Sequence, residues 1–295
     1  MRIRQPFDLG QTAECGQAFR WMRTDGYYRC VINGSLLKVR QQGHMVFASL
    51  FPYADAEGTM NTLVDVFRLD DDMDQILGEI SSDRFIAEAV GRHNGLRLLR
   101  QDPWECLISY LCSINSNIPR IKGNVERLCR HFGESIECDG TVFHTFPTVD
   151  ALSSASTVEL RKLKLGFRAE YIAAAARKVK EEGLELLSLR EAPYEEAFDT
   201  LLSFHGVGPK VADCVLLFSM DKLEAFPVDR WVKRGVELLY FGGATVPERK
   251  IREWAQQHFG KYAGYAQEYL FYGSRLREIA AASGSLPKSP LSELK

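Results

Sequence analysis

Apolar and polar residues alternate along the first part of the chain. Three short runs follow this pattern and are bounded by turn residues: YYRCVING (27–34), SLLKVRQQG (35–43) and HMVFASL (44–50). Such alternation is typical of strands with one buried face. Asn33-Gly34 indicates a tight hairpin, because both residues tolerate the positive φ angles of a two-residue turn. The pattern stays strand-like to about residue 69 and predicts an antiparallel sheet.

From about Ser82 onward, apolar residues recur at the three- and four-residue spacing of amphipathic helices. The clearest segments are PWECLISYLCSI (103–114), NVERLCRHF (124–132), TVELRKLKL (157–165) and AEYIAAAARKVKEE (169–182). The predicted fold class is therefore α+β, with an N-terminal antiparallel β-sheet domain over residues 1–81 and a mainly α-helical body over residues 82–283. Residues 284–295 hold turn residues and little periodicity, so we expect a flexible tail there.

A glycine-rich turn joins two further helical segments and predicts a helix-hairpin-helix over about residues 194–220. Gly206 and Gly208 flank Val207, and Pro209 stands where the second helix begins, a position that suits proline. The free N–H groups of a helix start favour a phosphate. We therefore expect the backbone of Gly206, Val207 and Gly208 to contact DNA phosphate, although such a turn is as often purely structural.

Lys210 follows this turn directly. It lies in the first helical turn, where the helix dipole disfavours a positive charge, so part of the amine could be neutral and nucleophilic. Cys214, four residues on, shares its face of the helix. A lysine taken at random is a solvated surface residue, and the position after GVGP favours a chemical role for this one.

Asp229 closes the PVD segment and precedes the helical run DRWVKRGVELL. Its simplest role is to cap that helix. A capped carboxylate is also a fixed carboxylate, so Asp229 could at the same time face the carbon that a nucleophile attacks.

Composition limits the alternatives. The 295 residues can bury sizeable cores, and no apolar run reaches the length of a membrane span. No secretory leader is expected at Met1. Seven scattered cysteines fit a reducing compartment. The net charge of −2 does not indicate nucleic-acid binding, but lysines and arginines concentrate between Arg161 and Lys180 and predict a local basic face with a modest salt dependence.

The segments GVGPKVADC and PVD resemble the active-site block of the helix-hairpin-helix DNA glycosylases, and in particular the 8-oxoguanine DNA glycosylase family. Four further blocks support this in the family's order: CGQAFRW (15–21), SINSNIPRI (113–121), LKLGFRAEYI (163–172) and YAGYAQEYLF (262–271). The resemblance implies a bifunctional repair enzyme. Lys210 would attack the sugar of an extruded 8-oxoguanine nucleotide, Asp229 would stabilise the charge that develops there, and a Schiff base would lead to strand cleavage by β-elimination.

The resemblance also assigns the base pocket. The Gly16 carbonyl would accept from the N7–H that only the lesion carries, and Gln267 would read the Watson–Crick edge. Phe271 and Cys214 would form the walls. Taken alone, Phe271 and Cys214 are more simply explained as core residues, and Gly16 as a turn.

On the opposite strand, the resemblance assigns the orphaned cytosine to Asn115, Arg120 and Arg168, and the wedge in the base stack to Phe167. Relatives often carry tyrosine at the wedge position and a second asparagine where this chain has Ser116. These departures leave the opposite-base preference open.

No redox cofactor or metal ion is expected. An iron–sulfur cluster is not expected either, because the cysteines lack the clustered spacing of a cluster site. The hairpin could still hold a structural cation between its carbonyls and a phosphate. The expected partner is double-stranded DNA containing 8-oxoguanine. We expect the protein to bind this DNA as a monomer and not to associate with a membrane. The expected location is the bacterial or archaeal cytoplasm with its nucleoid, or the nucleus in a eukaryote.

Three other interpretations of the function remain. A monofunctional glycosylase would keep Asp229 but lack the lysine. A glycosylase for alkylated bases should lack the Gly16, Gln267 and Phe271 arrangement. A non-catalytic DNA-binding module would have no task for Lys210.

Overall fold

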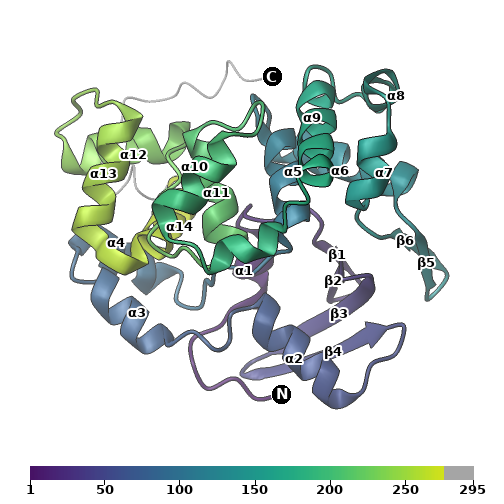
Figure 1. The fold of residues 1–295 in the computed structure, drawn as a ribbon. Helices are drawn as coiled ribbons and strands as arrows, with labels where there is room; N and C mark the ends of the chain where they lie inside the picture. The colour runs from purple at the N-terminus through teal and green to yellow at the C-terminus, as the bar shows by residue number, and fades with distance from the viewer. Residues whose placement is uncertain (276–295) are drawn as a thin grey trace, which may run out of the picture.

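The computed structural model describes residues 1–275, and the predicted tail at 284–295 lies outside them. Four antiparallel strands form one sheet in sequential order (Figure 1): β1 (Met22–Thr24), β2 (Tyr27–Ile32), β3 (Ser35–Gln42) and β4 (Met45–Phe51). The predicted hairpin is confirmed, since Asn33 and Gly34 have φ angles of 48° and 78°. β2 and β3 then pair in register from Ile32 and Ser35 outward.

Helices make up most of the rest. The structure forms α1 (Leu9–Glu14), α2 (Ala56–Val66), α3 (Met73–Ile80), α4 (Arg84–Arg92), α5 (Pro103–Ser113), α6 (Ile118–Phe132), α7 (Val149–Ser154), α8 (Thr157–Lys162), α9 (Arg168–Glu181), α10 (Tyr194–Leu202), α11 (Pro209–Ser219), α12 (Arg230–Tyr240), α13 (Glu248–Phe259) and α14 (Ala263–Arg275), with short 3₁₀ turns at η1 (Leu186–Arg190) and η2 (Gly260–Tyr262). Every helix predicted above is present, so the α+β fold class is confirmed. None of the helices in residues 1–275 has the length and apolar character needed to cross a bilayer.

The strand-like pattern assigned up to residue 69 is wrong for residues 56–66, which form α2. Asp55 caps this helix by accepting from the Gly58 N–H at 2.7 Å, and Leu63 and Val66 are buried one turn apart. That spacing is helical and does not alternate, which explains the difference.

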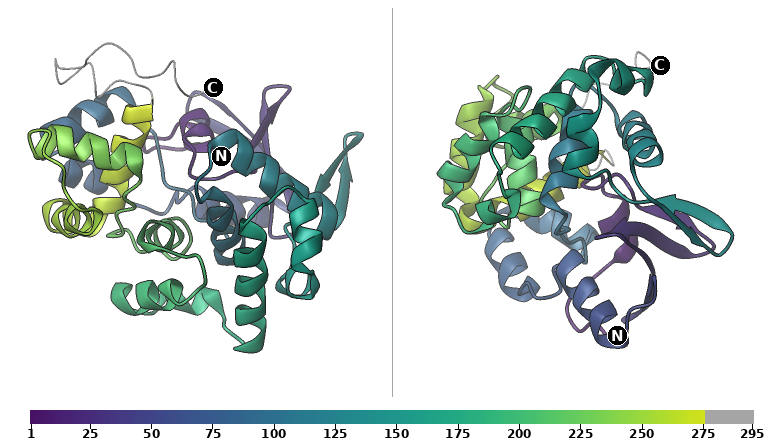
Figure 2. Two further views of the ribbon diagram at one scale, coloured as in Figure 1. Left: turned by 90° about the horizontal axis from the view of Figure 1, so that it is seen from above. Right: turned by 45° about the vertical axis from the view of Figure 1, so that its right-hand side comes forward.

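A second hairpin lies inside the helical body, between β5 (Ser135–Cys138) and β6 (Thr141–His144). Its turn is Asp139-Gly140, with φ angles of 52° and 71°. The hairpin extends alongside the main sheet (Figure 2), where Ile136 and Phe143 pack with Val31 and Leu36 in a small apolar cluster.

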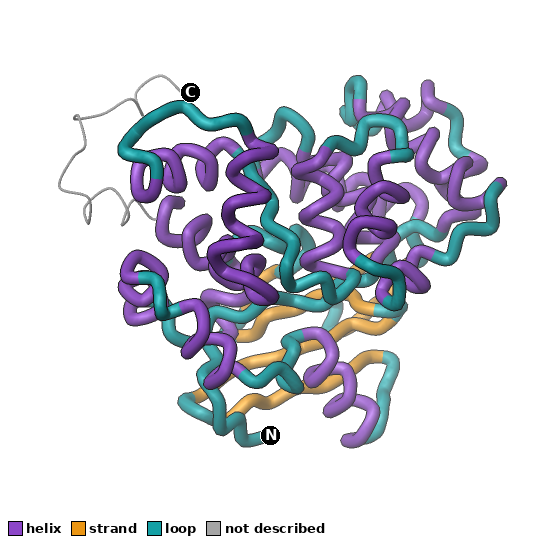
Figure 3. Tube along the Cα trace, turned by 60° about the vertical axis from the view of Figure 1, so that its left-hand side comes forward, coloured by secondary structure: helices purple, strands orange, loops and turns teal. Residues whose placement is uncertain are grey.

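Two larger cores lie on either side of the sheet–helix boundary, with the helices above the sheet in Figure 3. The sheet core contains residues from Ile3 to Phe67, and the helical core contains residues from Met73 to Leu270. They interlock, because Cys15 and Phe19 enter the helical core whereas Leu99 returns to the sheet core. The division of the chain into two domains between residues 81 and 82 stays a prediction.

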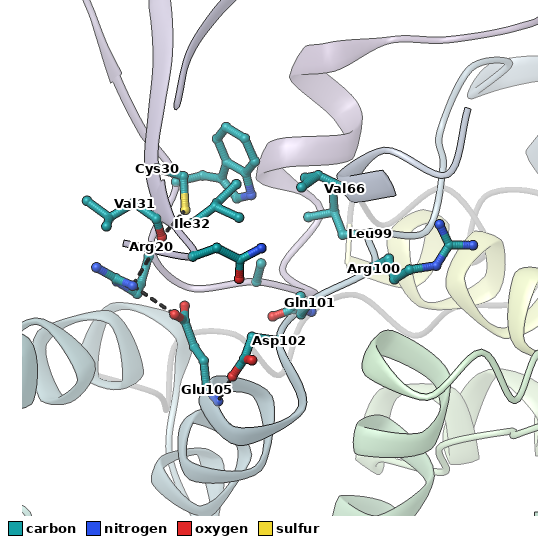
Figure 4. A pocket seen from close by; sticks show the side chains of 13 residues that line it. Arg20, Cys30, Val31, Ile32, Val66, Leu99, Arg100, Gln101, Asp102 and Glu105 are labelled. Atoms are coloured by element: carbon teal, nitrogen blue, oxygen red, sulfur yellow. Dashed lines mark hydrogen bonds and ion pairs between the residues drawn. The ribbon is translucent and has the colours of Figure 1, made fainter. Parts of the chain in front are cut away.

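A buried ion pair joins the two parts. Arg20, just before β1, donates to Glu105 Oε2 of α5 at 2.8 Å, to Val31 O at 3.2 Å and to His144 O at 2.5 Å. The pair borders a cavity of about 50 Å³ between β2 and the start of α5 (Figure 4). None of the predicted site residues lines this cavity. Burial raises the pKa of Glu105, against the opposing effect of the Arg20 charge.

Replacing Arg20 by methionine should therefore destabilise the fold, because Glu105 would remain buried without its cation. We expect a loss of about 3–5 kcal/mol in urea unfolding near pH 8. The loss should shrink toward pH 5, because the folded-state pKa of Glu105 lies above the unfolded value and protonation removes the buried charge. Arg130→Met, which breaks the exposed Arg130–Glu126 pair, should cost no more than about 0.5 kcal/mol. Equal losses in both variants would contradict this.

Candidate active site

Helix α11 places Lys210 at the site. All residues from Val211 to Ser219 are buried, so the helix packs on every side and only its first turn reaches the surface. Gly208 is the N-cap and Pro209 occupies the first turn, as predicted. Because glycine offers no capping side chain, the first N–H groups of α11 remain available to a ligand.

Lys210 is half-buried at this helix end. Its Nζ lies 3.4 Å from Ser113 Oγ and 5.0 Å from the centre of the Tyr110 ring, both on α5. The amine thus points into the junction between α5 and α11.

Asp229 caps α12, as predicted. One carboxylate oxygen accepts from the Trp231 N–H at 2.9 Å and from the Val232 N–H at 2.8 Å, which fixes the carboxylate. The charges of Lys210 and Asp229 both act on Cys214, with opposite effects on the pKa of its thiol. Within residues 1–275 no direct ion pair joins Lys210 to Asp229.

The hairpin turn is held by an aromatic side chain. Gly206 has φ 88°, and a Cβ there would lie 2.5 Å from Cγ of Tyr171 on α9, so both the backbone and the packing require glycine. Tyr171 meets the His205 ring edge-on at 4.9 Å and the Phe167 ring at 5.7 Å. The turn and the predicted wedge residue are therefore packed against one side chain.

Gly16 follows α1 and has φ 111°, a backbone conformation that favours glycine. The next residue, Gln17, is 2% exposed and accepts on its backbone carbonyl from the Tyr110 hydroxyl at 3.0 Å. Tyr110 is also the residue whose ring faces Lys210. One side chain therefore connects the Gly16 loop to the predicted nucleophile.

Gln267 and Phe271 lie on α14, four residues apart, as predicted. Gln267 is 4% exposed, and its Oε1 is buried without a hydrogen-bond partner among the described residues. A buried orphan oxygen costs free energy unless a ligand satisfies it. Burial raises the pKa of the Cys214 thiol to about 12, although the Lys210 charge opposes this. Cys214 is thus a neutral thiol and suits a pocket wall.

The three predicted cytosine contacts gather at the C-terminal end of α5. Asn115 is exposed with φ 48°, a left-handed conformation that asparagine tolerates. Arg168 is buried and donates to Ile114 O and Asn115 O, the latter at 2.9 Å. Burial lowers the pKa of Arg168, and the charge of Arg120 adds to that effect; Arg120 lies in the first turn of α6, where its N–H donates to Asn117 Oδ1. Arg168 thus holds the loop that carries Asn115.

Phe167 is 44% exposed, as a wedge should be. The Arg168 guanidinium carbon lies 4.6 Å from the centre of its ring and supports it.

Three of the seven lysines and arginines between Arg161 and Lys180 pair with carboxylates. Arg161 pairs with Glu170, Lys178 with Glu182, and Lys180 with Asp150. Glu170 lies on α9, Glu182 is the C-cap of α9, and Asp150 lies on α7, which packs against α9. DNA would therefore meet fewer unpaired cations here than the sequence indicated, and the basic face stays a prediction.

No group of three or more potential metal ligands occurs in residues 1–275. The absence of a metal or cluster, and the structural cation at the hairpin, stay predictions.

Comparisons with known proteins agree with this geometry. Residues 2–107 match the N-terminal domain model of 8-oxoguanine DNA glycosylase. Residues 108–261 match the model of the HhH-GPD superfamily of base excision DNA repair proteins. The chain belongs to the 8-oxoguanine DNA glycosylase family. Gly16 lies in the first matched region and Lys210 and Asp229 in the second, whereas Gln267 and Phe271 lie beyond both.

Individual relatives resemble most of the chain. The N-glycosylase/DNA lyase OGG1 of Arabidopsis thaliana is 36% identical over 89% of this chain and 76% of its own length. A probable N-glycosylase/DNA lyase of Methanothermobacter thermautotrophicus is 31% identical over 91% and 94%. The Clostridium acetobutylicum 8-oxoguanine glycosylase/lyase, solved with double-stranded DNA containing cytosine opposite 8-oxoguanine, is 36% identical over 92% of both chains, with a TM-score of 0.87.

Three residues at the site were not predicted from the sequence: Ser113, Tyr110 and Gln17. Ser113 and Gln17 lie inside blocks that carry the family resemblance, which was a usable signal. Tyr110 lies in the apolar helix α5 and had none, because only the tertiary packing brings its hydroxyl to Gln17.

Helix α11 also carries a buried carboxyl, Asp213, that accepts from the Tyr194 hydroxyl at 2.6 Å and lies 3.8 Å from Arg252 Nη1. Burial raises the pKa of Asp213 to about 7, while Tyr194 and Arg252 lower it and Glu195 raises it.

The free energy of unfolding should therefore decrease as the pH rises from about 4 to about 7. In this range the folded state keeps a proton on Asp213, whereas the unfolded chain releases that proton near pH 3.9. The variant Asp213→Asn cannot titrate and should lack this component, which is at most about 1.4 kcal/mol per pH unit. Urea unfolding of both proteins across this range measures it. Parallel curves would show that Asp213 does not titrate there.

Proposed function

We propose that the protein excises 8-oxoguanine from duplex DNA with Lys210 as the nucleophile and cleaves the resulting abasic site through a Schiff base. Family membership makes it a DNA N-glycosylase with abasic-site lyase activity, and the proposal adds which residues do the chemistry. The observation that carries it is the half-buried Lys210 amine at the exposed end of α11, beside the Tyr110 ring. The Asp229 carboxylate, which the α12 cap holds in place, adds to it.

In the first step, the neutral Lys210 amine attacks C1′ of an extruded nucleotide. The N–C1′ bond forms as the glycosidic bond breaks, and the base leaves with the electron pair and gains a proton. The sugar carries positive charge at this stage, and a nearby carboxylate stabilises it. Asp229 suits this role because its cap hydrogen bonds hold it in place.

In the second step, the ring oxygen takes up a proton as the C1′–O4′ bond breaks, and the adduct becomes a protonated Schiff base. Loss of a C2′ proton to a base then forms the C2′–C3′ double bond and breaks the C3′–O bond, and the downstream strand leaves with a 5′ phosphate. Water hydrolyses the Schiff base and returns the amine. Neither step needs an oxidant or a reductant, so the reaction needs no redox cofactor.

Lesion recognition would use the Gly16 loop and α14. An N7–H donor on 8-oxoguanine would satisfy the Gly16 carbonyl, whereas guanine would place its N7 lone pair there. The orphan Oε1 of Gln267 supports this, because a base edge would supply the missing donor. Leaving a buried polar group unpaired is a strong means of discrimination. The exposed Phe167 would fill the gap in the stack.

Relatives support the same activity. Two are named N-glycosylase/DNA lyase, and the Clostridium structure contains cytosine opposite 8-oxoguanine. A monofunctional glycosylase would leave Lys210 without a task. Action as a monomer, in the cytoplasm or the nucleus according to the host, belongs to the proposal.

Replacing Lys210 by glutamine should abolish the covalent complex that borohydride traps on 8-oxoguanine DNA. Excision should fall by at least about 10³-fold, because the nucleophile is gone. Lys222→Gln is a matched control, since Lys222 is also partly buried but bonds Arg190 O beyond the far end of α11. It should trap normally. A trapped complex with Lys210→Gln would remove Lys210 from its role.

Replacing the exposed Arg120 by alanine should reduce the preference for cytosine opposite the lesion by about tenfold, the size of one charge-assisted hydrogen bond. Single-turnover excision opposite each of the four bases measures this preference. Arg130→Ala, an exposed arginine on the same helix, should leave it unchanged. An unaltered preference with Arg120→Ala would contradict the assignment.

A further inference from the structure

Both neighbours of Gly16 are fixed by hydrogen bonds. The Gln17 amide donates to Arg97 O at 2.8 Å and to Cys15 Sγ at 3.1 Å, and its Oε1 accepts from the Leu99 N–H at 2.7 Å. Gln17 therefore uses its whole side chain to hold the loop against the segment that leads into α5. This leaves the loop little freedom to move.

The Gln17 backbone carbonyl is held separately. It accepts from the Tyr110 hydroxyl and from Gln101 Nε2, each at 3.0 Å. Burial raises the pKa of Tyr110 well above its ordinary value, so the hydroxyl stays protonated and remains a donor. The Tyr110 ring keeps its other contact, 5.0 Å from Lys210 Nζ.

On the other side of Gly16, the Cys15 thiol donates to Thr12 O at 3.3 Å and accepts from the Gln17 amide at 3.1 Å. Thr12 lies on α1, so this contact holds the start of the loop to the helix before it.

The Tyr110 side chain thus contacts both the Gly16 loop and Lys210. We propose that Tyr110 is a positioning residue that fixes the Gly16 loop for lesion recognition and sets the position of that loop relative to Lys210. The inference rests on the proposed function and assigns a further task within the same site. The Tyr110 side chain does not need to touch the reacting atoms.

The two activities separate this role from a general structural one. Excision of 8-oxoguanine needs the Gly16 carbonyl at the base, whereas cleavage of a preformed abasic site needs Lys210 but has no base to read. Loss of the Tyr110 hydroxyl should therefore slow excision and spare the lyase step. The remaining bond from Gln101 limits the effect.

The main test is Tyr110→Phe, which keeps the ring beside Lys210. We expect single-turnover excision of 8-oxoguanine opposite cytosine to fall by about threefold to tenfold, as for one lost hydrogen bond. Cleavage of a preformed abasic site should stay within about twofold of wild type, which is a rate difference of less than about 0.5 kcal/mol. Tyr240→Phe is the matched control, because it removes a hydroxyl bonded to Asp83 at 2.9 Å, and should change neither rate.

The second variant is Gln101→Leu, which removes the other donor to the Gln17 carbonyl. It should lower excision and spare abasic-site cleavage in the same way, with a thermal melt confirming the fold.

Unchanged excision in both variants would overturn the proposal, as would an equal fall in excision and lyase rates, since the residues would then act on Lys210 or on the fold. Failure of the wild-type protein to excise 8-oxoguanine would instead refute the proposed function, and the two results are distinguishable in one experiment.

Discussion

The burial of α11 is the constraint on which the site depends. A short helix enclosed by apolar neighbours cannot slide or rotate without opening cavities, and cavities cost several kcal/mol in a packed core. Its contacts with α5 and α10 therefore determine where Lys210 lies. The one carboxyl inside it, Asp213, is satisfied by Tyr194 and approached by Arg252, so even the polar content of α11 ties it to α10 and α13.

The rest of the site is assembled from segments far apart in the chain. Gly16 follows the first helix, Lys210 begins the eleventh, and Gln267 lies on the last described one. What brings them together is the interlocking of the two cores, in which Cys15 and Phe19 pack among the helices. The site therefore lies where the sheet domain meets the helical body, and Arg20, Gln17 and Tyr110 hold that junction with hydrogen bonds from both sides.

Local features of the site could be predicted from the sequence. The cap at Asp229, the glycine turn at Gly206 and the Asn33-Gly34 hairpin are each determined by residues close in the chain, and the structure shows all three. Asp139-Gly140 is also a residue pair typical of hairpin turns, but it lies between helical segments. The second hairpin was therefore not predicted from the sequence. The contact between Tyr110 and Gln17 could not be predicted, because the two residues are distant in sequence.

The charge pattern shows a different limit. Arginines and lysines between residues 161 and 180 looked like a basic surface, but Lys178 and Glu182 are four residues apart on one helix turn, a spacing that pairs them. That spacing was visible in the sequence, whereas the Lys180–Asp150 pair needs the contact between α7 and α9. Counting cations along a helix overstates the field that DNA would meet, because the acidic residues beside them are part of the same surface.

These pairs leave part of the predicted DNA contact to backbone groups. The N–H groups at the start of α11 and the rigid turn at Gly206 would supply phosphate contacts that do not depend on side-chain charge. Backbone donors contribute little net charge, so they hold a phosphate at one position without strengthening binding along the whole duplex. The predicted wedge Phe167, which packs on the Tyr171 ring beside this turn, would act next to these donors. Affinity concentrated at one distorted nucleotide suits a protein that must distinguish a single altered base from the many unaltered ones around it.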